Sequence, residues 1–165
     1  MLSVTSAAGN IYSDKRLSEK YRRMEAAGAC ERLLVSRMEM ERLRLRRRTD
    51  RGTDIGLVLE PGSRLYNGDV LVLTKDRLVI VEQLPEKVIS ISIGKSGNAT
   101  GLAALVGHAI GNRHRPIAVN GSTISFPIQA DSEVALFQKL LPRGIKLKLE
   151  ERVFQPTGEF HSHEH

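Results

Sequence analysis

The feature that most constrains the fold is the order of apolar patterns after residue 85. Apolar residues alternate with polar ones at 88–93, recur with helical spacing at 98–110, and alternate again at 117–119 and 123–128. A second helical stripe follows from Asp131 or Ser132, either of which can cap it, and a last alternating run covers 145–149. Asn120-Gly121 is a strong hairpin signal between the two middle strands. The predicted order is βαββαβ, the ferredoxin-like arrangement of one sheet and two helices.

The preceding stretch, residues 33–84, shows short apolar runs separated by turn residues. Strand patterns occur at 43–46, 55–59, 70–73 and 78–81, with turns at 50–54, 61–62 and 67–69. Asp54 and Asp69 stand beside glycine in such turns, so we interpret them as structural rather than catalytic. This pattern predicts a small all-β domain, and residues 82–86 look like a linker. The fold class is therefore α+β, a small all-β domain followed by a ferredoxin-like domain at 85–153 and a tail at 154–165.

Residues 1–32 are harder to place. Leu17, Tyr21 and Met24 form a thin helical stripe that Ser13 or Asp14 can cap. A surface helix or a partly ordered N-terminal arm explains this pattern, and a partner-binding helix is the alternative.

Composition limits the location and the class of protein. With 41% hydrophobic but only 4% aromatic residues, the core must be aliphatic. The sequence has no apolar run of 18 residues and no secretory signal, so we expect neither a membrane span nor export. Cys30 is the single cysteine and fits a reducing, cytoplasmic location.

A net charge of +6 raises the question of nucleic-acid binding. Arginines alternate with leucines at 42–46 and continue to Arg48, which is typical of a strand with a basic, solvated face. A phosphate-binding stripe is the other interpretation, but few aromatic residues are available to stack on bases. A small basic RNA-binding module with a ferredoxin-like domain therefore stands as the alternative function.

The segment 107–116 contains the main candidate site. A single apolar stripe precedes it, formed by Leu102, Leu105, Val106, Ala109 and Ile110. Asn98 can cap the start of this helix, and Gly111 or Asn112 can end it in a left-handed conformation. Because Pro116 prevents the helix from resuming, His114 should lie on a tight turn just past the helix end.

An exposed histidine can bind Ni, Cu or Zn, although one imidazole holds a metal weakly. His108 is six residues earlier and does not share a helical face with His114. A second copy of His114, brought close by a two-fold dimer axis, is the most economical additional ligand. The alternative is a histidine that is only a hydrogen-bonded capping residue.

The run Gly111-Asn112-Arg113-His114-Arg115-Pro116 resembles the GNRH-x-P signature of the urease accessory protein E family, the metallochaperones that supply nickel to urease. The arginine-rich strand, Asp54-x-Gly56 and Gly68-Asp69-Val70-Leu71 precede it in the family's order, and a histidine-bearing tail follows. The resemblance covers residues 33–165. It implies that 33–84 is a peptide-binding type of domain, that 85–153 binds metal, and that the protein is not an enzyme.

The resemblance also implies the cargo and the partners. Ni(II) is the expected cargo, held mainly by His114 at a dimer seam of the C-terminal domain, and Zn(II) or Cu(II) should also bind in vitro. His161, His163 and His165 of the tail are further candidate ligands, and His108 is an auxiliary one at best. An unstructured tail without function is the alternative for 154–165. Expected partners are the urease G protein and the apo-urease accessory complex, and neither membrane nor nucleic acid is expected.

The sequence also departs from the family pattern. Some members carry a histidine pair on the second hairpin of the C-terminal domain, but residues 124–130 contain no histidine. An auxiliary site there is not expected. No nucleophile, phosphate-loop, HExxH or paired-cysteine motif is present that would favour an enzyme.

Overall fold

The computed structural model describes residues 1–95 and 97–157 and divides the chain into two compact units, Met1–Leu84 and Pro85–His165. The division falls inside the segment 82–86 that the sequence indicated as a linker. Strand β6 (Leu78–Gln83) and strand β7 (Glu86–Ser92) extend into this segment, so that only residues 84 and 85 separate them.

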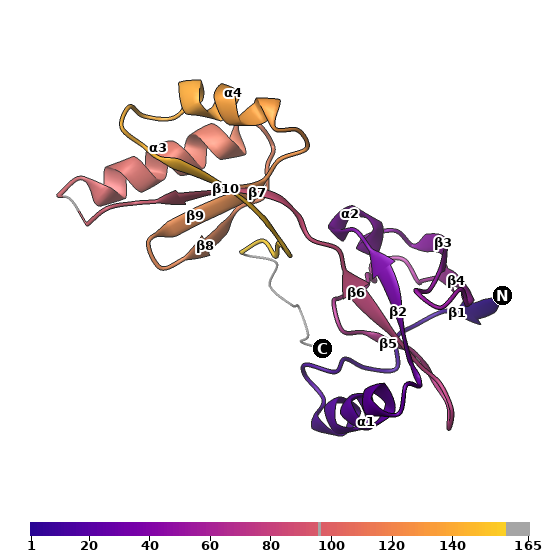
Figure 1. Cartoon of the computed structure of the whole chain (residues 1–165). Coiled ribbons are helices and arrows are strands. Elements are labelled where there is room, and N and C mark those ends of the chain that lie inside the picture. The colour runs from indigo at the N-terminus through magenta and orange to yellow at the C-terminus, as the bar shows by residue number, and fades with distance from the viewer. Residues whose placement is uncertain (96, 158–165) are drawn as a thin grey trace. The chain divides into compact units, whose positions relative to one another are not determined.

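The first unit contains two three-stranded sheets (Figure 1). One has the order β1-β4-β3, in which β1 (Leu2–Val4) runs parallel and β3 (Arg44–Arg48) antiparallel to β4 (Asp54–Val58). The other has the order β2-β6-β5, in which β2 (Cys30–Val35) runs parallel and β5 (Val70–Leu73) antiparallel to β6. A short helix, α2 (Arg37–Met40), follows β2, and Ser36 and Glu39 form a capping box at its start.

The sequence of strand β6 is a continuous apolar run from Leu78 to Val81 because both of its faces are buried. Val79 and Val81 belong to the core shared by the two sheets, whereas Leu78 and Ile80 pack with Met24 of helix α1 (Lys15–Ala26). A strand buried on both faces has no polar positions to alternate with. The sheet is therefore covered by the other sheet on one side and by α1 on the other.

This packing corrects the expectation of a separate N-terminal arm at residues 1–32. Strand β1 is hydrogen-bonded to β4, the apolar stripe of α1 covers the second sheet, and Cys30 begins β2. Asn10 also donates a hydrogen bond of 2.9 Å to the buried carboxylate of Asp69. Asp14 caps α1 by accepting from the amides of Arg16 and Leu17. Residues 1–32 are part of the first unit because its second sheet would otherwise expose an apolar face.

The second unit has the order β7, α3, β8, β9, α4, β10, which confirms the α+β class and the βαββαβ order. Its elements after β7 are α3 (Ala99–Gly111), β8 (Ala118–Asn120), β9 (Thr123–Pro127), α4 (Ser132–Leu140) and β10 (Leu147–Arg152). The sheet order is β10-β7-β9-β8 with all neighbours antiparallel, so β9 lies between β7 and β8.

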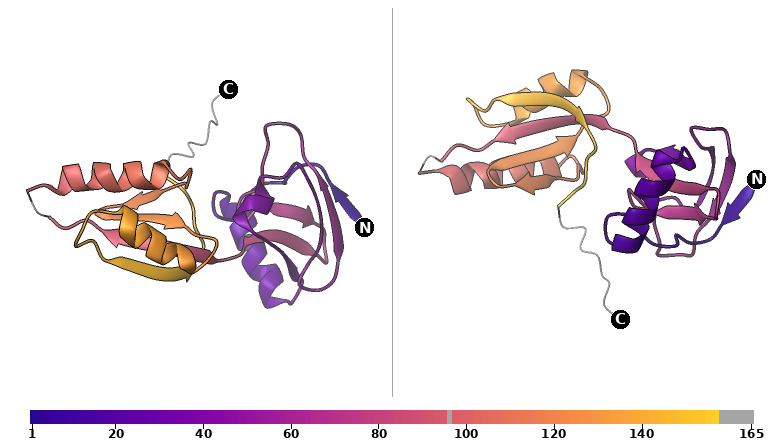
Figure 2. Two further views of the ribbon diagram at one scale, coloured as in Figure 1. Left: turned by 90° about the horizontal axis from the view of Figure 1, so that it is seen from above. Right: turned by 60° about the horizontal axis from the view of Figure 1, so that its bottom comes forward.

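Both helices of the second unit cover the same face of this sheet (Figure 2). Ile89 and Ile91 of β7 pack in one cluster with Val106 and Ile110 of α3 and with Phe137 of α4. The opposite face carries the polar residues that alternate with these isoleucines, such as Ser90, so the period-two pattern separates the core face from the face without helices.

Three local expectations for these helices are wrong in detail. Asn98 precedes α3 but makes no side-chain cap hydrogen bond, and Leu105 is 57% exposed rather than packed in the core. Leu105 lies at the flank of the apolar stripe, where the sheet no longer covers it. Asp131 precedes α4 but makes no side-chain cap hydrogen bond, and its carboxylate pairs with Lys87 instead. Glu133 in the first turn accepts from the amides of Gln129 and Ala130, which lie just before the helix.

The basic strand β3 is a solvated sheet face. All four arginines of β3 are exposed. Arg46 pairs with Asp54 and Arg47 with Glu39, which balances the charge of two of the four. Of the helices that the structure describes, none combines the length and apolar character required to cross a membrane.

Candidate metal-binding turn at His114

The end of helix α3 forms a turn whose hydrogen bonds define a Schellman motif. The amide of His114 donates to the carbonyl of Gly111 over 2.8 Å, and the amide of Arg115 donates to the carbonyl of Ile110 over 3.4 Å. In this motif the residue at the position of His114 takes the left-handed conformation. The φ angle of His114 is 54°, and among the described residues it is the one non-glycine residue with a positive φ.

The structure therefore corrects the expectation that Gly111 or Asn112 would take the left-handed position. Gly111 is still helical and Asn112 has a right-handed φ of −65°. A glycine at the position of His114 would adopt this conformation without steric cost, whereas an L-residue with a Cβ is strained there. Strain of this kind often accumulates at functional sites, where the side chain is needed despite the cost.

The side chain of His114 is available to a ligand. It is exposed, and it makes no hydrogen bond with any residue that the structure describes. The backbone, not the imidazole, terminates the helix. This argues against the alternative in which His114 is a hydrogen-bonded capping side chain.

Among the described residues, no ready-made set of metal ligands surrounds His114. His108 is exposed on α3, six residues earlier. Within residues 1–95 and 97–157 no cluster of three or more histidine, cysteine or acidic side chains could hold a metal ion. His161, His163 and His165 lie outside the described residues. The described part of one chain thus offers no site with three side-chain ligands that includes His114.

An ion pair that the sequence did not reveal holds the turn to the second helix. The guanidinium of Arg115 pairs with the carboxylate of Glu133, and both side chains are largely buried. The same carboxylate accepts the amides of Gln129 at 2.7 Å and Ala130 at 3.1 Å, which fixes the start of α4. Glu133 therefore ties the residue next to His114 to the start of the second helix. An acidic residue in the first turn of α4 was the only sequence signal for this role.

The outer side of α3 carries small and apolar residues along much of its length. Gly101 and Ala104 are exposed there, next to Leu105 and His108. An exposed leucine among small residues leaves room for close approach of another surface. This face runs along α3 toward the turn that carries His114, and its last member, His108, lies three residues before the helix ends at Gly111.

The sequence of the chain is similar to one family of known proteins. Residues 15–84 match the model described as UreE urease accessory protein, N-terminal domain. The chain is 33% identical to the urease accessory protein UreE of Natronomonas pharaonis over 99% of this chain and 81% of that protein. It is 31% identical to UreE 1 of Pseudomonas syringae pv. tomato over 79% of this chain and 86% of the relative. A UreE of Synechococcus sp. strain JA-3-3Ab is 35% identical over 74% and 79% of the two chains.

Proposed function

The chain belongs to the UreE family of urease accessory proteins, and we propose that it binds Ni²⁺ as cargo and delivers it for assembly of the urease active site. The observation that carries the proposal is the exposed imidazole of His114, placed on a strained turn where glycine would be more stable. Neutral imidazole is a good ligand for Ni²⁺, Cu²⁺ and Zn²⁺.

Two copies of His114 across a two-fold axis would supply two nitrogen ligands from one residue per chain. The exposed face of α3 around Leu105 supports such a contact, because it is apolar and lies on the helix that ends at the turn. We therefore propose a homodimer formed through the second unit, with the metal at its seam.

His161, His163 and His165 are proposed as additional ligands from the tail, with His108 in an auxiliary role. A metal held by imidazoles from several segments can leave by losing one ligand at a time, which suits delivery better than storage. In this account the receiving partners are the urease G protein and the apo-urease accessory complex, in the cytoplasm, and the protein has no catalytic activity of its own.

Isothermal titration of the full chain with nickel tests the proposal. We expect one Ni²⁺ per dimer, and His114→Ala should weaken binding at least about tenfold because it removes two ligands of one site at once. His108→Ala is the matched control, because His108 is an exposed histidine on α3 six residues before His114, and its loss should leave one Ni²⁺ bound per dimer. An unchanged affinity of the His114→Ala protein with one metal still bound per dimer would reject the site.

A further inference from the structure

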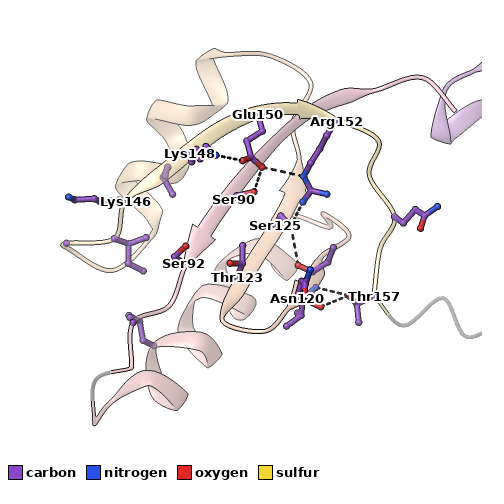
Figure 3. Close-up of a pocket in the computed structure, with 18 of the residues that line it drawn as sticks. Ser90, Ser92, Asn120, Thr123, Ser125, Lys146, Lys148, Glu150, Arg152 and Thr157 are labelled. Carbon is purple, nitrogen blue, oxygen red and sulfur yellow. Dashed lines mark hydrogen bonds and ion pairs between the residues drawn. The ribbon is translucent and has the colours of Figure 1, made fainter.

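A broad groove of about 1250 Å³ lies on the face of the second unit's sheet that the helices leave uncovered (Figure 3). Its floor consists of hydroxyl side chains that alternate with core residues along the two central strands, namely Ser90, Ser92, Thr123 and Ser125. Strand β10 and the turn before it form one wall, and β8 with Gln155 and Thr157 forms the other. None of the lining residues is a histidine, so the groove is separate from the turn at His114.

One part of the groove is internally satisfied. The carboxylate of Glu150 accepts from Ser90 at 2.9 Å and pairs with Lys148 at 2.7 Å and Arg152 at 3.4 Å. Arg152 in turn donates to the hydroxyl of Ser125 over 2.7 Å. The hydrogen bonds from Lys148 and Ser90 hold the pKa of Glu150 below its ordinary value. This network binds the single carboxylate of the lining to two cations and leaves no free negative charge in the groove.

The other part of the groove has unused donors. Arg143 and Lys146, in the turn before β10, are exposed, and their side chains have no partner among the described residues. The side chains of Ser92, Thr123 and Asn120 likewise have no hydrogen-bond partner among the described residues. Thr123 lies opposite Ser92 on one side and opposite Asn120 on the other. These donors therefore form a row across the sheet that ends near two free cations.

We propose that this groove binds an acidic, extended polypeptide segment of a partner protein. The lining carries four cationic side chains and one neutralised carboxylate, so it complements a chain of carboxylates. The row of hydroxyl and amide side chains can hydrogen-bond the backbone of an extended segment. Since neighbouring strands are about 4.8 Å apart, a segment of about five residues spans the four strands.

Two other kinds of ligand fit the groove less well. Pockets for small organic ligands are enclosed and mainly apolar, whereas this groove is open and its floor is hydroxyl-rich. Sheet faces that bind single-stranded RNA stack bases on aromatic side chains. The lining of the groove contains no aromatic residue, so the RNA-binding alternative gains no support from this face.

The probe for the test is a fluorescein-labelled deca-glutamate peptide, followed by fluorescence anisotropy with the full-length protein. The double variant Arg143→Glu/Lys146→Glu should weaken binding at least about tenfold, because it reverses both free charges of the groove. Thr123→Val keeps the side-chain volume and removes one hydroxyl, and it should weaken binding about threefold. Amide resonances of residues 92, 120 and 123 should shift on titration with the peptide.

The matched control is Arg44→Glu/Arg48→Glu, which makes the same charge change on two exposed arginines of β3 in the first unit. This control should change the affinity for the peptide less than about twofold relative to wild type, because salt screens charges that lie far from the groove. Equal weakening by the two double variants would show attraction to net charge alone and overturn the proposal. The proposal would also be overturned by resonance shifts confined to β3, or by tighter binding of a deca-uridylate at the groove.

Discussion

Replacing His114 by glycine should make the metal-free protein more stable, although it removes the proposed ligand. His114 occupies the left-handed position of a Schellman motif with φ of 54°. Its imidazole makes no hydrogen bond to the described residues, so the substitution removes no hydrogen bond within that part of the chain. The effect on the free energy of unfolding is then set by the backbone alone.

The magnitude follows from two opposing terms. Relief of the left-handed strain stabilises the native state by about 1–2 kcal/mol. The larger backbone freedom of glycine in the unfolded chain costs about 0.4–1 kcal/mol. The expected net gain is about 0.5–1 kcal/mol, which corresponds to a rise in Tm of about 1–4 °C for a chain of this size.

Differential scanning calorimetry of the metal-free protein measures this change. His114→Ala is the matched control, because it also removes the imidazole but retains a Cβ and therefore the strain. We expect the Tm of His114→Gly to lie above those of both the wild type and His114→Ala, while both variants bind nickel weakly. A glycine variant no more stable than the alanine variant would refute the interpretation that strain at residue 114 is retained for function.

Three further predictions concern the stability of hydrogen bonds and turns within each unit. Glu133→Ala should lower the free energy of unfolding by about 2 kcal/mol in urea titration, since it removes the ion pair with Arg115 and two hydrogen bonds from the amides of Gln129 and Ala130, and it should also weaken nickel binding. In Glu39, hydrogen bonding from Ser36 holds the pKa below the ordinary 4.5, so its stabilisation is present above pH 4.5 and is lost as the pH falls through the lowered pKa. Glu39→Gln should thus be about 1 kcal/mol less stable than wild type at neutral pH, with the difference vanishing in urea titrations in strong acid. Gly68→Ala should destabilise by about 1–2 kcal/mol, because φ is 85° and the new Cβ would lie 2.5 Å from the ring of Tyr12; Gly62→Ala, with a similar φ and open space, should cost less in the same thermal melts.

The strands and helices of the second unit follow from the sequence because the unit has one buried face per element. Ile89, Ile91 and Ile93 alternate with serines, and the helix stripes keep their spacing. Sequence patterns are most informative where burial is one-sided. The same logic explains the error at residues 1–32, where the short stripe of α1 gives no indication that β6 needs a cover on both faces.

The details of the site were less accessible to sequence reasoning. A left-handed residue is expected to be glycine or asparagine, so Gly111 and Asn112 were the natural candidates, and only the structure places the strain at His114. The pair of Arg115 with Glu133 joins residues 18 positions apart, which no local pattern encodes. The groove likewise depends on strand order, because its serines and threonines come from strands separated by a whole helix.

The central claim is that two copies of His114 share one nickel ion across a dimer axis. An anomalous difference map from a nickel-loaded crystal tests it most directly. The account predicts one peak on the two-fold axis, about 2.1 Å from an imidazole nitrogen of His114 in each protomer. A peak remote from residue 114, or one held by the imidazole of a single protomer, would contradict it.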